Sequence, residues 1–122
     1  MNAPINAVLK EIAWIDVGAA TDIPRRGARR LPSPIGDIAV FRTGDGEVYA
    51  LRDACPHKGG PLSQGIVHGR SVACPLHNWN IDLASGQPTG ADAGKGCAPV
   101  IPVKVVEGRV LLALPAQLLA AE

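Results

Sequence analysis

The sequence predicts an all-β protein, built as a small antiparallel sandwich with barrel-like sheets. The first observation is the number of turn-forming residues, 14 glycines and 11 prolines among 122 residues, which favours many short strands over long helices. The second is that apolar residues gather in short runs between these turns, a pattern typical of strands. We therefore expect about ten strands in a single domain. This domain spans residues 1–122, with its core at about 8–114 and a C-terminal tail at 115–122.

Four strands are expected in the first half of the chain. They lie at residues 10–14, 28–31, 35–42 and 47–51. The last two flank a Thr-Gly-Asp-Gly segment at 43–46. Two strand-forming runs on either side of such a turn predict a β-hairpin.

The second half of the chain is expected to alternate loops with short strands. Loops rich in Gly and Pro are predicted at 53–65, 75–78 and 89–98, and strands at 71–73, 79–83, 100–106 and 109–114. A Glu-Gly turn separates the last two strands, which predicts a second hairpin. Proline is favoured at the first position of a helix, so one or two helical turns are expected from Pro115 onward.

Composition excludes several classes of function. The net charge is +1 and aromatic residues make up 3% of the chain, so we expect no nucleic-acid partner. No apolar run approaches the roughly 20 residues that cross a bilayer, and the N-terminus lacks the pattern of a secretory signal. Three cysteines leave at least one outside any disulfide, which favours metal ligation in a reducing compartment. We therefore expect a cytoplasmic protein with no membrane partner.

Two short segments carry the ligand-type residues of the chain. Cys55 and His57 form a C-x-H motif, and after 16 intervening residues Cys74 and His77 form a C-x-x-H motif. One class of [2Fe–2S] cluster is held by two cysteines on one iron and two histidines on the other. Each motif offers one thiolate and one imidazole, so the pair predicts one such cluster. No nucleophile–base pair or paired carboxylate is found, and no catalytic residue is expected.

The residues around these ligands suit a cluster. Gly59 and Gly60 follow the first motif and let the backbone approach the cluster closely. Pro56 and Pro75, one after each cysteine, stiffen the loops. An alternative is a structural zinc site, because zinc also accepts two cysteines and two histidines. Common zinc spacings pair cysteine with cysteine and histidine with histidine, however, which this sequence does not do.

The two motifs resemble those of the Rieske [2Fe–2S] family. Residues 53–65 and 74–79, with the hairpin that ends near residue 112, further resemble the small subunits of assimilatory NAD(P)H-dependent nitrite reductases. The resemblance covers residues 10–114 and implies a Rieske-type fold with two cluster-binding loops at one tip. It also implies electron transfer to a large flavin- and siroheme-carrying subunit that reduces nitrite to ammonia in nitrate assimilation. This chain would not be catalytic alone.

Two alternatives stay open beside that interpretation. The first is a Rieske ferredoxin whose partners are an aromatic-ring dioxygenase and its reductase. The second is a structural subunit, either cluster-free or bound to zinc. In either Rieske case Gly60 and Leu76 stand where high-potential members carry extra cysteines. We therefore expect a low reduction potential, about −150 mV, at the lower end of the Rieske range.

A few other residues are expected to have structural roles. Cys97 is interpreted as a structural thiol, although its loop could approach the cluster. Trp79 is expected to pack beneath the cluster, and His68 to lie in an exposed turn. Four arginines between residues 25 and 30 form either a solvated surface or a docking patch for a partner protein.

Overall fold

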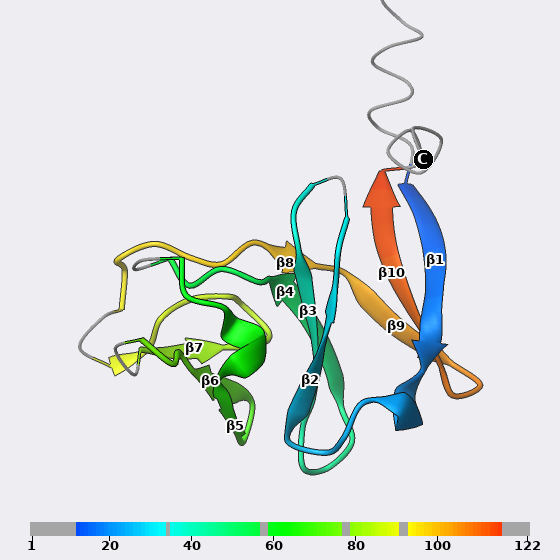
Figure 1. Cartoon of the computed structure of the whole chain (residues 1–122), viewed down its shortest axis with the longest axis horizontal. Coiled ribbons are helices and arrows are strands. Elements are labelled where there is room, and N and C mark those ends of the chain that lie inside the picture. Colours follow the sequence, from blue (N-terminus) through cyan, green and yellow to red (C-terminus); the bar gives the residue numbers. More distant parts are fainter. Residues whose placement is uncertain (1–11, 34, 57–58, 77–78, 91–92, 116–122) are drawn as a thin grey trace, which may run out of the picture.

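The all-β prediction is confirmed by the computed structural model, which describes residues 12–33, 35–56, 59–76, 79–90 and 93–115 (Figure 1). The described part contains ten strands and two short 3-10 helices. The strands are β1 (Ile12–Ala19), β2 (Gly27–Leu31), β3 (Ile38–Arg42), β4 (Val48–Arg52), β5 (Ile66–His68), β6 (Ser71–Ala73), β7 (Asn80–Asp82), β8 (Val100–Ile101), β9 (Val103–Val106) and β10 (Arg109–Pro115). The helices are η1 (Ala20–Asp22) and η2 (Leu62–Gln64). None of the described helices has the length and apolar character that a bilayer crossing requires.

The strands form three open antiparallel sheets. The terminal sheet has the order β1-β10-β9, the central sheet β2-β3-β4-β8, and the cysteine-side sheet β5-β6-β7. Figure 1 shows the central sheet between the other two, with the terminal sheet on the right and the cysteine-side sheet on the left. The sandwich-like arrangement agrees with the expectation, and the described strands do not close into a barrel.

Strand β3 explains why the central sheet is covered on both faces. Successive side chains of a strand point to opposite faces. Ala39 and Phe41 enter one buried cluster, and Ile38 and Val40 enter another. All four residues are at most 1% exposed. The continuous apolar run of this strand therefore reflects burial from both sides.

Two hydrophobic cores result from this arrangement. The cysteine-side core lies between the central and cysteine-side sheets, and the terminal core lies against the terminal sheet. The cysteine-side core contains Ala39, Phe41, Leu51, Cys55, Leu62, Val67, Val72, Cys74, Ile81, Leu83 and Ala98. The terminal core contains Ile23, Ile38, Val40, Ala50, Ile101, Val110, Leu112 and Leu114.

The predicted strand at 100–106 is divided by Pro102. Strand β8 pairs with β4 in the central sheet, whereas β9 pairs with β10 in the terminal sheet. Proline has no backbone N–H to donate to a sheet, and the carbonyl of Pro102 instead accepts the N–H of Ala113 at 3.0 Å. The prediction of one continuous strand was therefore wrong, although the hairpin with residues 109–114 is confirmed.

Strand β5 was not expected from the sequence. Residues 66–68 are exposed, buried and exposed in turn, which is the alternation of a strand with one covered face. The segment is only three residues long and is flanked by Gly65 and Gly69. An alternation this short between two glycines cannot be distinguished from a loop in the sequence. The pairing of β5 with β6 closes a tight hairpin.

The two ends of the described chain also differ from expectation. Strand β1 (Ile12–Ala19) continues past the predicted end at residue 14, with a register shift between Asp16 and Gly18, and residues 10 and 11 of the predicted strand lie outside the described residues. Pro115 ends strand β10 instead of starting a helix. The rest of the predicted helical tail, residues 116–122, lies outside the described residues.

Candidate metal centre

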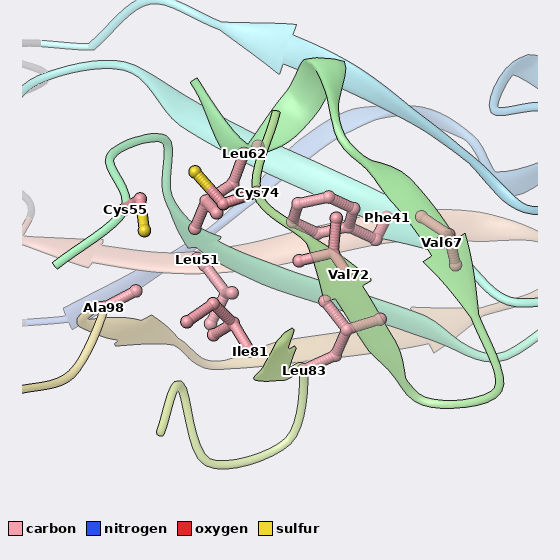
Figure 2. Packing of buried hydrophobic residues seen from close by; sticks show 11 residues of the cluster. Phe41, Leu51, Cys55, Leu62, Val67, Val72, Cys74, Ile81, Leu83 and Ala98 are labelled. Carbon is pink, nitrogen blue, oxygen red and sulfur yellow. The ribbon is translucent and has the colours of Figure 1, made fainter. Parts of the chain in front are cut away.

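Cys55 and Cys74 lie together in the cysteine-side core. Cys55 follows β4 and Cys74 follows β6 directly, so two different sheets position them. Their exposed fractions are 2% and 1%. Figure 2 shows both sulfur atoms at the same end of the core, while Phe41 and Val67 lie toward the other end. The structure thus brings together the two sulfur ligands that the sequence predicts, and the predicted ligands His57 and His77 lie outside the described residues.

Each cysteine loop closes on itself in the same way. The backbone N–H of Cys55 donates to the carbonyl of Gly60 at 2.8 Å, and that of Cys74 donates to the carbonyl of Trp79 at 2.8 Å. Both hydrogen bonds join a cysteine to the residue five positions later. In the first loop the N–H of Gly59 also donates to the carbonyl of Cys55 at 2.8 Å. Gly59 has φ +72, a conformation that residues with a Cβ rarely adopt.

Gly60 is the point at which the first loop meets the second. A Cβ added at this position would lie 3.0 Å from the Cys74 sulfur and 2.9 Å from the side chain of Leu76. A larger residue would therefore push the two loops apart, and glycine permits the close approach. The side chain of Leu76 is 51% exposed, so the second loop presents an apolar side chain to solvent next to Gly60.

A third loop packs against the first. A Cβ added at Gly96 would lie 3.2 Å from the Cβ of Pro56, and Ala98 is buried in the cysteine-side core. Cys97 lies between them and is exposed. The structure therefore places this thiol at the surface, in a loop that contacts the first cysteine loop. Trp79, which was expected to pack beneath the cluster, is partly buried against the core that contains both cysteines.

All four arginines near residue 28 are exposed, and three of them contact other parts of the chain. Arg25 donates to the carbonyl of Gly44 and Arg29 to that of Val17, whereas Arg30 pairs with Asp37. These three side chains join separate parts of the chain.

Asp53 and Ser63 are residues of the site that sequence reasoning missed. The Asp53 carboxylate is fully buried and accepts both the N–H and the hydroxyl of Ser63. An aspartate two residues before a cysteine has no distinctive spacing. Only the folded loop shows that it reaches a serine ten residues away.

Of the four predicted cluster ligands, the structure describes the two cysteines, Cys55 and Cys74. Two buried cysteines meet beside a glycine that leaves room at one sulfur, and this donor set fits a [2Fe–2S] group. Among the described residues, no group of three or more His, Cys, Asp or Glu side chains could hold a metal ion.

The chain is an open all-β sandwich in which two closed loops each place a buried cysteine at one end of a core. These features are those of a small protein with a cysteine-ligated metal centre. Residues 13–106 match the Rieske [2Fe-2S] domain. The chain belongs to the Rieske family, and it is an electron-transfer protein with one Rieske-type [2Fe–2S] cluster.

Several curated relatives are ferredoxins of oxygenase systems. The anthranilate 1,2-dioxygenase ferredoxin subunit of Burkholderia cepacia is 42% identical over 79 residues, which cover 60% of this chain and 66% of that protein. The alignment thus spans just under two thirds of that relative. The ferredoxin component of the naphthalene 1,2-dioxygenase system of Pseudomonas aeruginosa is 31% identical, over 83% of this chain and 95% of that protein.

Solved structures similar to this chain come from both oxygenase systems and nitrite reductases. A carbazole 1,9a-dioxygenase complex of oxygenase and ferredoxin contains a chain with TM-score 0.73 and 33% identity, covering 82% of this chain and 92% of that one. A proposed NADH-dependent nitrite reductase small subunit from Mycobacterium tuberculosis has TM-score 0.75 and 26% identity, covering 86% and 97%. Dicamba monooxygenase aligns with TM-score 0.73 and 27% identity, over 85% of this chain but only 34% of its own.

Proposed function

We propose that Cys55, His57, Cys74 and His77 hold the cluster, within one Rieske domain that spans residues 1–122. The burial of Cys55 and Cys74 in one core supports the sulfur half of this ligand set. When bound, the cluster accepts and donates one electron at a time. The residues of the chain keep the two sulfur atoms away from water, and a backbone hydrogen bond closes each cysteine loop and so fixes its shape.

Substitution of single cysteines tests this ligand set. We expect Cys55→Ser and Cys74→Ser to lose the iron, the visible absorption and the rhombic EPR signal of the dithionite-reduced protein. The matched control is Cys97→Ser, which removes an exposed thiol and should keep all three. A colourless wild-type protein that contains zinc would support the structural alternative instead. Full cluster content in Cys74→Ser would contradict the assignment.

We further propose that the protein is the ferredoxin component of an oxygenase system and carries electrons from a reductase to the oxygenase. The observation that carries this proposal is the set of relatives named as dioxygenase ferredoxin components. Three of them are 31–32% identical to this chain over 93–95% of their own lengths. The three cysteines support a cytoplasmic location.

The second candidate is the small subunit of an NAD(P)H nitrite reductase. Its support is the structural similarity to the proposed mycobacterial nitrite reductase subunit, with TM-score 0.75 over 97% of that chain. The segments at 53–65 and 74–79 also resemble that group. In this case the partner is a large subunit with flavin and siroheme, and the chain passes electrons within that complex.

Deletion of the gene in its host distinguishes the two partners. Loss of growth on aromatic compounds as carbon source, with normal growth on nitrite as nitrogen source, supports the oxygenase system. The reverse pattern supports nitrite reductase and overturns the first assignment. Normal growth under both conditions would contradict both. Plasmid-borne wild-type gene should restore growth, and the Cys74→Ser gene should not.

A further inference from the structure

A buried carboxylate ties the two ends of the first cysteine loop together. Asp53 stands just before Cys55, and Ser63 lies in helix η2 beyond Gly60. The Ser63 N–H donates to Oδ1 of Asp53 at 2.7 Å, and the Ser63 hydroxyl donates to Oδ2 at 2.6 Å. Both carboxylate oxygens of Asp53 therefore accept a hydrogen bond from Ser63. We call this pair of bonds the Asp53–Ser63 contact.

The buried carboxylate of Asp53 has a guanidinium beside it as well as its two bonds to Ser63. A buried charge is costly unless it is paired and hydrogen-bonded. The side chain of Asp53 is 0% exposed, and the Nε of Arg30 lies 3.5 Å from its Oδ2. A hydrogen bond to Asp37 raises the pKa of Arg30, so the guanidinium beside Asp53 stays charged.

The Asp53–Ser63 contact joins the two ends of the loop that contains the predicted ligand Cys55. The backbone N–H of Asp53 donates to the carbonyl of Asp37 at 2.9 Å, which anchors the start of the loop to the segment before β3. The other end is anchored by Leu62, a fully buried neighbour of Ser63 in the cysteine-side core. Cys55 and Gly60 lie between these anchors and are joined by their own hydrogen bond. Separating the anchors would loosen the turn that holds the Cys55 sulfur.

We propose that Asp53 is a positioning residue for the metal centre, which acts by holding Ser63 and so fixing the loop that presents Cys55. This inference rests on the proposed ligand set and goes beyond it, because neither Asp53 nor Ser63 contacts the cluster in that set. Hydrogen bonds to charged groups are among the stronger ones in proteins. Their loss should open the loop more often and admit water and chelators to the site.

The test measures the rate at which the purified holoprotein loses its visible absorption in an excess of an iron chelator. We expect Asp53→Asn and Ser63→Ala each to accelerate this loss by about tenfold, the factor that corresponds to one hydrogen bond to a charged group. Ser63→Thr keeps the hydroxyl and the N–H and should restore nearly the wild-type rate. The double variant should be no faster than the faster single variant, because both changes break the same contact.

A matched control is available in the same half of the molecule. Asp82, the last residue of β7, accepts the N–H of Ser85 at 2.9 Å, so Asp82→Asn makes the same Asp-to-Asn change at a hydrogen-bonded aspartate in a turn that does not hold a predicted ligand. It should lose its cluster at the wild-type rate. Equal acceleration in Asp82→Asn and Asp53→Asn would show a general loss of stability and overturn the proposal, as would wild-type rates in both Asp53→Asn and Ser63→Ala.

Amide hydrogen exchange provides a readout that does not depend on the identity of the bound metal. The peptide covering residues 53–65 should exchange faster in Asp53→Asn and Ser63→Ala than in wild type, and at the wild-type rate in Asp82→Asn. Unchanged exchange in this peptide contradicts the inference. If Asp53→Asn fails to fold, Ser63→Ala decides the question because it removes only a hydroxyl. A wild-type protein without a Rieske EPR signal would contradict the ligand set, while exchange would still report on the Asp53–Ser63 contact.

Discussion

The two faces of the central sheet support cores of different character. The terminal core consists of aliphatic residues, most of them from the central and terminal sheets. The cysteine-side core contains two cysteines and an alanine from loops, together with strand residues. Strand β3 contributes alternate side chains to both. Stability is thus shared across the molecule, but the architecture confines the candidate metal site to one face, so substitutions on the two faces should have separable effects.

The largest expected effects come from one large residue in each core. Phe41 and Leu112 are both 0% exposed, the first in the cysteine-side core and the second in the terminal core. Phe41→Ala should lower the free energy of unfolding by about 3–5 kcal/mol, and Leu112→Ala by about 2–5 kcal/mol. Urea denaturation followed by circular dichroism measures both.

The two variants should differ in the rate at which they lose the cluster. In the folded protein, Phe41→Ala should also speed cluster loss to a chelator, because the cavity lies in the same core as Cys55 and Cys74. Leu112→Ala should leave the rate and the EPR line shape unchanged below the unfolding transition. Equal acceleration by both variants would mean that the central sheet does not separate the two regions.

A smaller effect is expected from two glycines in the cysteine-side half. Gly86 has φ +73, and a Cβ there would lie 2.0 Å from the carbonyl oxygen of Ala98. Gly69 has φ +57 with no atom within 4 Å of such a Cβ. Gly69→Ala should therefore cost about 1–2 kcal/mol from backbone strain alone. Gly86→Ala should cost about 3 kcal/mol, because it also displaces the loop that contains Ala98.

Thermal and urea unfolding of the two alanine variants provide the check. Only Gly86→Ala should also accelerate cluster loss, since Ala98 is buried with the cysteines. Equal costs at the two positions would show that the third loop moves aside freely.

The smallest effect is expected from an exposed ion pair of the terminal sheet. A hydrogen bond from Arg109 holds the pKa of the Asp16 carboxyl below its ordinary value of 3.8. A carboxyl whose pKa is lower in the folded state stabilises the protein above the unfolded pKa, and this contribution is lost as the pH falls through the folded value. Asp16→Asn should therefore flatten the decline in stability below about pH 4.

Urea midpoints measured at a series of acidic pH values test this prediction. The change should be slight, because both side chains are about half exposed and such pairs contribute little. Cluster loss at pH 7 should match the wild-type rate. A steeper acid decline in Asp16→Asn than in wild type would contradict a lowered pKa of Asp16 in the folded protein.

Local patterns predicted much of the fold, and long-range contacts account for what they missed. Residues 71–73 and the hairpin ending at 109–114 were expected correctly, because alternation and turn residues act over short distances. Strand β5 was missed because its pattern is three residues long. The division at Pro102 was missed because the residues before and after it pair with strands of two different sheets, which the local pattern does not show.

The candidate site shows the same division. Ligand spacing is a local signal, so Cys55 and Cys74 could be identified from the sequence, and the structure places both in one core. The Asp53–Ser63 contact joins residues ten positions apart through side-chain atoms. No periodicity or motif reports such a contact, since it depends on how the loop between them is folded.

The pairing of Ile12 with Pro115 in the terminal sheet has a consequence for the architecture of larger proteins. The described chain enters and leaves through adjacent strands, on the opposite side of the central sheet from the cysteine-side sheet (Figure 1). A domain with neighbouring entry and exit points tolerates insertion into another chain and circular permutation. The unit can therefore be placed within a longer enzyme without disturbing its metal-binding end, consistent with a matching region that makes up 34% of dicamba monooxygenase.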